Sequence, residues 1–218
     1  IGYRPEEYAA HGKDWANRGK LMDECIDTML KAWTGEPFEY RGTTVQVTPI
    51  PVSKPTPPFL LGGTSKPAAR RAARFKLPIF FAAPVPELMA YYYEQCQLEG
   101  WPGFAMMPGV GFEHHFIVED PDKAWAELGH HLFHETSTYA SWQTPDIKSA
   151  VHSHATTVEE LRAEGMYRFV TPDEIVAQAK ATGPEFSFNL HPMCGGMPID
   201  KAWESLQLYE DKVLPQLS

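Results

Sequence analysis

Two glycines and two hydroxyl residues stand together at positions 62–65, which read Gly-Gly-Thr-Ser. They separate the apolar run Phe59–Leu61 from a segment rich in alanine and arginine that begins at Pro67. Glycine has no Cβ, so a ligand can come close to the backbone N–H groups. A helix that starts here would also direct its unpaired N–H groups and the positive end of its dipole at the ligand. The pattern therefore predicts a phosphate site, and it leaves a plain capped turn open as the alternative.

Three arginines follow this loop, at Arg70, Arg71 and Arg74. By composition they resemble phosphate ligands. At about 100° per residue, however, the alanines of the same segment gather on one side of the helix and the arginines on the other. We therefore expect the alanines to pack on a sheet and the arginines to point outward, away from a ligand.

Histidines are the second group with chemical potential. His130, His131 and His134 are three and four residues apart on a predicted helix, but the HExxH order of a zinc site is absent. His114 and His115 are neighbours on a predicted strand, where successive side chains face opposite sides. At most one of this pair can face a ligand, as a proton donor or hydrogen-bond partner. We expect no metal site.

A second glycine pair, Gly195-Gly196, lies in the segment His191–Pro198, just before the last predicted helix. Phosphate can bind at such a position in a (β/α)8 barrel, after its last strands. The pair is thus a rival to Gly62-Gly63, although we favour a flexible turn here.

The surrounding chain alternates short apolar strands with helices. We predict strands at 59–61, 78–81, 110–118 and 186–190, and helices at 5–33 with a break near Gly12, 67–75, 86–99, from Asp120, from Thr171 to Gly183, and at 199–214. Strands that are apolar on both faces favour a parallel sheet covered by helices. Four such units match about half of a (β/α)8 barrel, which needs ~250 residues. The chain opens IGYRPEEY without a Met, so we expect a preceding part.

Two segments depart from this alternation. Pro37–Thr48 contains two strand-like runs around Arg41-Gly42 and predicts a hairpin insertion. Tyr139–Arg168 is polar and rich in histidine with weak periodicity, so we interpret it as a lid-like excursion. A capping box with Thr171 and Glu174 then predicts the start of a helix.

Composition limits the function. The chain of 218 residues suits a single domain over residues 1–218, and its formal net charge of −9 argues against a nucleic-acid surface. No apolar run approaches the ~18 residues of a membrane span. The three cysteines stand far apart and suit a reducing compartment, so we expect a cytoplasmic protein without membrane or nucleic-acid partners.

Several segments together resemble the bacterial luciferase-like flavin monooxygenases. They are GYRPEEY, WANRGKLMDE, WTGEPFEYRGTTVQVTPIPV, PPFLLGGTSKPAARRAARF, VTPDEIVAQ and GGMPIDKAWESLQLYEDKVLPQL, and they extend over nearly the whole chain. The resemblance implies an α/β TIM barrel that binds FMN or the deazaflavin F420. It implies that the loop Gly62, Gly63, Thr64 and Ser65 holds the flavin phosphate, with Gly2 and Tyr3 close to it.

The resemblance also implies a truncated barrel. The family's first strands, which often carry the active-site histidine, would precede Ile1, so the catalytic residues stay unknown and an isolated fragment would be inactive. The implied activity is the oxygenation of a small organic substrate with reduced FMN and O2. Alternatives are F420-dependent hydride transfer and a non-catalytic partner subunit. A flavin reductase as partner and a homo-oligomer of the full-length protein are expected. A phosphate-binding isomerase or aldolase would need a Lys or carboxylate at a strand end, and we find none.

Overall fold

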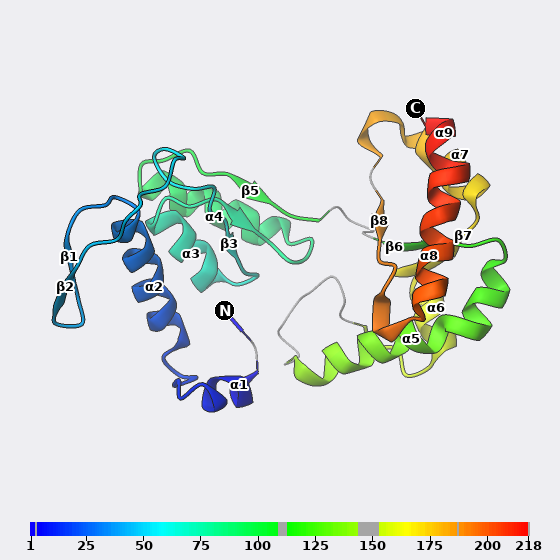
Figure 1. Ribbon diagram of the computed structural model, residues 1–218, viewed down its shortest axis with the longest axis horizontal. Coiled ribbons are helices and arrows are strands. Elements are labelled where there is room, and N and C mark those ends of the chain that lie inside the picture. Colours follow the sequence, from blue (N-terminus) through cyan, green and yellow to red (C-terminus); the bar gives the residue numbers. More distant parts are fainter. Residues whose placement is uncertain (3, 109–112, 144–152, 187, 218) are drawn as a thin grey trace. The chain divides into compact units, whose positions relative to one another are not determined.

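The computed structural model describes residues 1–2, 4–108, 113–143, 153–186 and 188–217. The chain divides into two compact units, which are described separately below (Figure 1). Unit 1 comprises residues 1–109 with 145–149, and unit 2 comprises residues 110–144 with 150–218. The single domain expected over residues 1–218 stays a prediction. Among the described residues, no helix combines the length and the hydrophobicity needed to cross a membrane.

Unit 1 contains a helical start, a hairpin and a small α/β layer. In chain order its elements are α1 (Pro5–Ala10), α2 (Arg18–Ala32), β1 (Phe38–Tyr40), β2 (Thr43–Val45), β3 (Leu61–Gly62), α3 (Lys66–Arg74), β4 (Ile79–Phe80), α4 (Pro86–Leu98) and β5 (Ala105–Met106). β3, β4 and β5 pair in parallel in this order, as neighbouring strands of a barrel do. The predicted parallel sheet is therefore confirmed for this unit, and β5 is an additional strand.

The core of unit 1 lies where α3 and α4 meet this sheet. Ala69, Ala72 and Ala73 of α3 are fully buried, because their small side chains let the helix approach closely. Tyr92 of α4 is also fully buried, and its hydroxyl donates a hydrogen bond to the carbonyl of Leu77 at 2.9 Å. The helix-covered face is thus close-packed, which fixes the positions of the strand ends.

The predicted hairpin at 37–48 is present. β1 and β2 pair antiparallel with Tyr40 opposite Thr43, so the loop consists of Arg41 and Gly42. Both loop residues have positive φ, 50° and 80°. Two positive values are typical of the type I′ turn, whose twist matches that of the strands it joins.

Unit 2 contains a second parallel sheet and its helices. In chain order its elements are β6 (His114–Ile117), α5 (Pro121–Trp142), α6 (Val158–Glu164), β7 (Tyr167–Val170), α7 (Pro172–Thr182), a 3-10 turn (Gly183–Glu185), β8 (Asn189–Leu190), a 3-10 turn (Cys194–Gly196), α8 (Ile199–Leu208), a π-helical turn (Tyr209–Val213) and α9 (Leu214–Leu217). All four residues of β6 are buried, which confirms a strand covered on both faces. The helices begin as predicted, with Asp120 capping α5 and Thr171 and Glu174 forming the capping box of α7.

The strand order of unit 2 is β7-β6-β8, with all pairs parallel. A regular (β/α)8 barrel has its strands in chain order, so β7 would stand in the middle. The α/β class is confirmed, and the strands of the described residues form a hairpin and two three-stranded sheets. The truncated barrel stays a prediction.

The stretch Tyr139–Arg168 is not one loop. Its first residues belong to α5, it contains the whole of α6, and it ends in the first half of β7, while residues 144–152 lie outside the described part. The interpretation as a single excursion is wrong for α6 and β7. The sequence Tyr-Arg-Phe-Val of β7 is rich in strand-forming residues and directly precedes the capping box, so the signal was available. A lid function stays a prediction.

Candidate functional site

The Gly-Gly-Thr-Ser loop joins the carboxyl end of β3 to α3. Ser65 is the N-cap of α3, and its Oγ accepts a hydrogen bond from the N–H of Ala68 at 3.3 Å. Thr64 Oγ1 accepts a hydrogen bond from the N–H of Ala82 at 3.2 Å, which ties the loop to the segment after β4. Each hydroxyl accepts in these contacts, so each still carries a hydrogen that it can donate to an anion. The loop is thus ordered by its own side chains and keeps donors for a ligand.

The two glycines of the loop differ in what they need. A Cβ on Gly63 would lie 2.7 Å from the Cβ of Ala68, so Gly63 is required for the close approach of the loop to α3. Its N–H donates to the carbonyl of Phe80 at 3.2 Å and is used in the sheet. A Cβ on Gly62 would meet no atom of the described residues within 4 Å. The plain-turn interpretation therefore explains Gly63 but not Gly62.

Gly62 lies on the sheet face that α3 and α4 do not cover. In the parallel ladder Gly62 stands opposite Phe80, and Phe80 stands opposite Met106. Phe80 and Met106 are 42% and 46% exposed, whereas Leu61 and Ile79 of the helix-covered face are buried. An apolar surface therefore adjoins the loop at the strand ends, and the missing side chain of Gly62 leaves room beside it.

The outward orientation predicted for the arginines is wrong for Arg71. Its side chain is 9% exposed, and its guanidinium forms an ion pair with Asp23 of α2 and donates to the carbonyl of Gly19 at 3.0 Å. Arg74, which is exposed, binds the same carboxylate at 3.0 Å. Burial alone would raise the pKa of Asp23, but the hydrogen bonds from the two arginines hold it below its usual value. Arg71 thus links α3 to α2. The helical wheel predicted that this side of α3 is exposed, but residues of α2 contact it.

The other residues expected near a phosphate are at the start of the chain. Gly2 is exposed, and a Cβ on it would lie 3.4 Å from the ring of Tyr8. Tyr3 lies outside the described residues. Their role stays a prediction.

Unit 2 contains a compact polar cluster that the sequence did not indicate. Glu135 of α5 is at its centre: its Oε2 accepts from the Sγ–H of Cys194 at 2.8 Å and from the N–H of Gly195 at 3.0 Å. Its Oε1 accepts from the hydroxyl of Tyr167 at 3.3 Å. Burial, together with the neighbouring carboxylate, raises the pKa of the Cys194 thiol. Glu135 and Cys194 are 59 residues apart, so no local pattern could have linked them.

This cluster excludes the rival phosphate site at Gly195-Gly196. The N–H of Gly195 already binds the Glu135 carboxylate, whose negative charge would repel an added anion. Gly195 has φ +56°, and a Cβ on it would lie 1.8 Å from the carbonyl oxygen of His131. Glycine is required there by the close packing of the turn on α5.

The adjacent histidines of β6 lie in different surroundings, as strand alternation predicts. His114 Nδ1 lies 2.8 Å from the amide nitrogen of Asn189, and its ring stacks on Tyr167. Burial, with a smaller contribution from His191, lowers the pKa of His114 to about 4.

His115 is 3% exposed and its Nε2 lies 3.2 Å from Oε2 of Glu113. Burial lowers the pKa of His115 against the opposing effect of that carboxylate. Both histidines of β6 are therefore neutral, buried groups at neutral pH.

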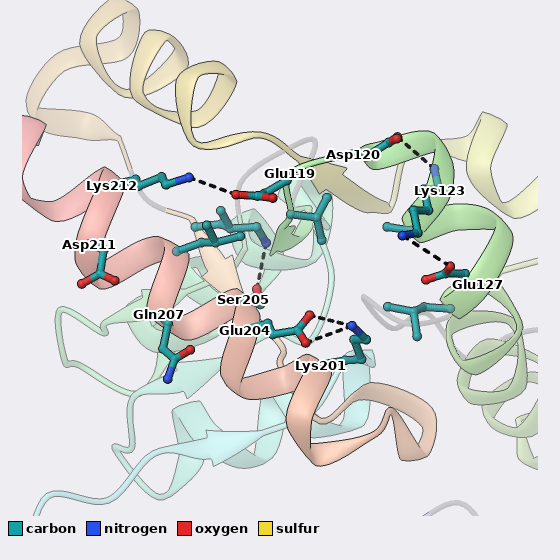
Figure 2. Close-up of a pocket in the computed structure, with 15 residues that line it drawn as sticks. Glu119, Asp120, Lys123, Glu127, Lys201, Glu204, Ser205, Gln207, Asp211 and Lys212 are labelled. Carbon is teal, nitrogen blue, oxygen red and sulfur yellow. Dashed lines mark hydrogen bonds and ion pairs between the residues drawn. The ribbon is translucent and has the colours of Figure 1, made fainter.

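A groove of about 600 Å³ lies between α5 and α8 at the carboxyl end of β6 (Figure 2). Its floor is apolar and its rim is charged. Glu119 follows β6 at this end, so the expectation that no carboxylate stands at a strand end is wrong. Figure 2 shows its three lysines directed at carboxylates: Lys212 at Glu119 (3.1 Å), Lys201 at Glu204 (2.7 Å) and Lys123 at Glu127 (3.9 Å). Because these lysines already have partners, the groove offers fewer free groups to a ligand than the strand-end loop of unit 1.

The chain is similar to several known proteins. The family model described as luciferase-like monooxygenase matches residues 1–187. Uncharacterized proteins of Mycobacterium bovis and Mycobacterium tuberculosis are 42% identical over 76 residues, which is 32% of this chain. The match spans 25% of these curated relatives.

Two solved structures are similar. The first is the oxygenating constituent of 3,6-diketocamphane monooxygenase from the CAM plasmid of Pseudomonas putida, a type II Baeyer-Villiger monooxygenase in complex with FMN. It is 17% identical with a TM-score of 0.52, and the alignment covers 100% of this chain and 69% of that chain. The second, apo-MsnO8, is 18% identical with a TM-score of 0.40 over 90% of this chain and 59% of that chain. The first likeness supports the α/β fold.

Proposed function

The chain belongs to the luciferase-like monooxygenase family. We propose that it acts as a flavin-dependent oxidoreductase and binds the flavin phosphate at Gly62, Gly63, Thr64 and Ser65. The observation that carries the proposal is the open space at Gly62. This glycine stands at the carboxyl end of a parallel strand, where α/β folds bind ligands, and packing within the described part of the chain does not require it.

The groups present in the loop fit a phosphate. The N-terminus of α3 supplies the positive end of a helix dipole, and the hydroxyls of Thr64 and Ser65 keep their hydrogens for phosphate oxygens. The exposed Lys66 adds a positive charge in the first turn. Phe80 and Met106 would offer apolar surface to the ring system. The loop thus combines a dipole, hydroxyl donors and a cation.

We favour FMN over F420, because the first of the similar structures is described in complex with FMN. When bound, reduced flavin supplies the chemistry that activates O2, and the protein positions the cofactor and excludes water. The residues of the loop bind and orient the flavin phosphate, and none of them transfers a proton. A small organic substrate and a flavin reductase as electron donor are proposed as partners.

The test is a titration of the chain with FMN, riboflavin and F420, each in both redox states, followed by flavin fluorescence. The proposal expects FMN to bind at least roughly tenfold more tightly than riboflavin, which lacks the phosphate and so loses about 1.4 kcal/mol or more. Tighter binding of F420 than of FMN would identify the deazaflavin as the cofactor. Failure of every flavin to bind, or equal affinity for FMN and riboflavin, would overturn the phosphate site.

Gly62→Leu provides the matched variant. It fills the open space with a side chain and should abolish the preference for FMN without unfolding the sheet, since no atom lies within 4 Å of the added Cβ. Gln97→Leu, which adds the same side chain to the exposed side of α4, is the control and should bind FMN normally. Gly63→Leu is unsuitable, because the contact with Ala68 would disturb the fold itself.

A further inference from the structure

Three side chains of different chemistry converge in unit 2: the carboxylate of Glu135, the imidazole of His191 and the thiol of Cys194. Their potential ligand atoms all lie within 4.8 Å of one another. Cys194 Sγ is 2.8 Å from Oε2 of Glu135, and His191 Nδ1 is 3.7 Å from Oε1. They come from α5, from the segment after β8 and from the following 3-10 turn, so the fold brings together three separate parts of the chain.

The hydrogen bonds of this cluster leave one nitrogen unused. Nδ1 of His191 is buried, and it has no hydrogen-bond partner among the residues that the structure describes. A buried polar atom without a partner costs free energy, so its orientation toward Glu135 calls for an explanation. The His191 side chain as a whole is 36% exposed, which leaves an entry path for a small ion.

The groups around the cluster hold the carboxylate in place. The hydroxyl of Tyr167 donates to one oxygen of Glu135, and the N–H of Gly195 donates to the other. Gly195 itself is pressed against the carbonyl of His131, and its own carbonyl lies 3.1 Å from Nδ1 of that histidine. Such outer partners orient the ligands of metal sites in proteins.

We propose that Glu135, His191 and Cys194 bind a zinc ion. Zn²⁺ takes carboxylate, imidazole and thiolate ligands at about 2.0–2.3 Å in a tetrahedron, so ligand atoms lie roughly 3.5 Å apart. The distances of 2.8 Å and 3.7 Å from the Glu135 carboxylate lie on either side of this value, and all three ligand atoms lie within 4.8 Å of one another. A sulfur, a nitrogen and a single carboxylate do not suit Mg²⁺ or Ca²⁺, which take oxygen ligands.

Binding replaces one hydrogen bond by three coordination bonds. The S–H bond of Cys194 breaks and its proton leaves to solvent, while the sulfur keeps its electron pair and shares it with the metal. Nothing is oxidised or reduced. The ion would join α5 to the segment after β8, and water would complete the tetrahedron on the exposed side of His191. This site lies in unit 2 and does not depend on the flavin proposal for unit 1.

The test uses the 218-residue chain without an affinity tag, stripped with a chelator and titrated with Co²⁺ as a spectroscopic substitute for Zn²⁺. We expect stoichiometric binding with the near-ultraviolet band of a cobalt–thiolate bond and the visible bands of tetrahedral cobalt, both removed by added Zn²⁺. Absence of stoichiometric binding would overturn the proposal.

Variants identify the ligands. Cys194→Ser should remove the thiolate band, and His191→Gln should weaken Zn²⁺ binding by roughly tenfold or more. Cys25→Ser, at an exposed cysteine outside the cluster, is the control and should keep both the band and the affinity. Circular dichroism of each stripped variant checks the fold. A thiolate band that survives Cys194→Ser, or that disappears with Cys25→Ser, would contradict the assignment.

Discussion

Gly62 and Phe80 stand opposite each other in the parallel ladder of β3 and β4, on the face that α3 and α4 do not cover. The neighbouring Gly63 faces the other way and lies against Ala68 at the start of α3. At this strand end, Gly63 is required for close packing, whereas Gly62 leaves an open space beside the sheet. The two positions can be separated by experiment.

We predict that Gly63→Ala destabilises the protein and Gly62→Ala does not. The new Cβ of Gly63→Ala would lie 2.7 Å from Ala68 Cβ, and such overpacking costs about 1–3 kcal/mol. Gly62→Ala meets no atom within 4 Å and should change the free energy of unfolding by less than about 1 kcal/mol. Urea unfolding of both variants measures the difference, and equal effects would refute the distinction.

Several features of both units could be predicted because their signals are local. The loop at 62–65, the capping box of α7 and the turn at Arg41-Gly42 each depend on residues a few positions apart, and all of them are present. β5 was missed because Ala105 and Met106 are not the β-branched or aromatic residues that indicate a strand.

Contacts between distant residues could not be predicted. Asp23 and Arg71 are 48 residues apart, and the helical wheel cannot tell which flank of α3 a neighbouring helix will cover. The strand order β7-β6-β8 and the convergence of Glu135 with Cys194 have the same origin, since both follow from tertiary packing. Sequence patterns thus located one candidate site and gave no signal for the other.

We predict that Asp23→Asn removes a stabilisation that depends on pH. The variant leaves the buried Arg71 without its carboxylate, which should cost about 2 kcal/mol at neutral pH. The folded state holds the pKa of Asp23 below the unfolded value of 3.8, so this stabilisation is complete above that value and is lost as the pH falls through the folded pKa.

Unfolding curves of Asp23→Asn and the unaltered protein should therefore differ at pH 7 and converge at acidic pH. Asp27→Asn is a suitable control, because its exposed pair with Lys31 contributes at most about 1 kcal/mol. A difference that stays constant down to the lowest pH would contradict the assignment.

We predict that the burial of His115 makes the protein less stable as the pH falls below about 6.5. Burial lowers the pKa of His115 in the folded state, so between the folded pKa and 6.5 the unfolded state binds more protons. Protonation of His115 then favours unfolding, and the free energy of unfolding decreases until the pH reaches the pKa of His115 in the folded state. His115→Gln, which cannot titrate, should flatten the stability curve over this range.

His130→Gln is the control for His115, because His130 is exposed on α5. It should leave the dependence of the unfolding free energy on pH nearly unchanged. A curve for His115→Gln that runs parallel to that of the unaltered protein between pH 5 and about 6.5 would show that His115 is not the group responsible.

The two glycines of the turn before α8 should respond very differently to alanine. Both have positive φ, 56° at Gly195 and 78° at Gly196, so each substitution costs about 1–2 kcal/mol for the backbone alone. A Cβ on Gly196 meets nothing within 4 Å, whereas one on Gly195 would lie 1.8 Å from the carbonyl oxygen of His131. That carbonyl belongs to the backbone of α5 and cannot move aside, so Gly195→Ala must displace the turn and break the hydrogen bond to Glu135.

We expect the free energy of unfolding to fall by more than about 4 kcal/mol in Gly195→Ala and by about 1–2 kcal/mol in Gly196→Ala, measured by thermal or urea unfolding. Similar losses for the two variants would show that the turn does not pack on α5 as described.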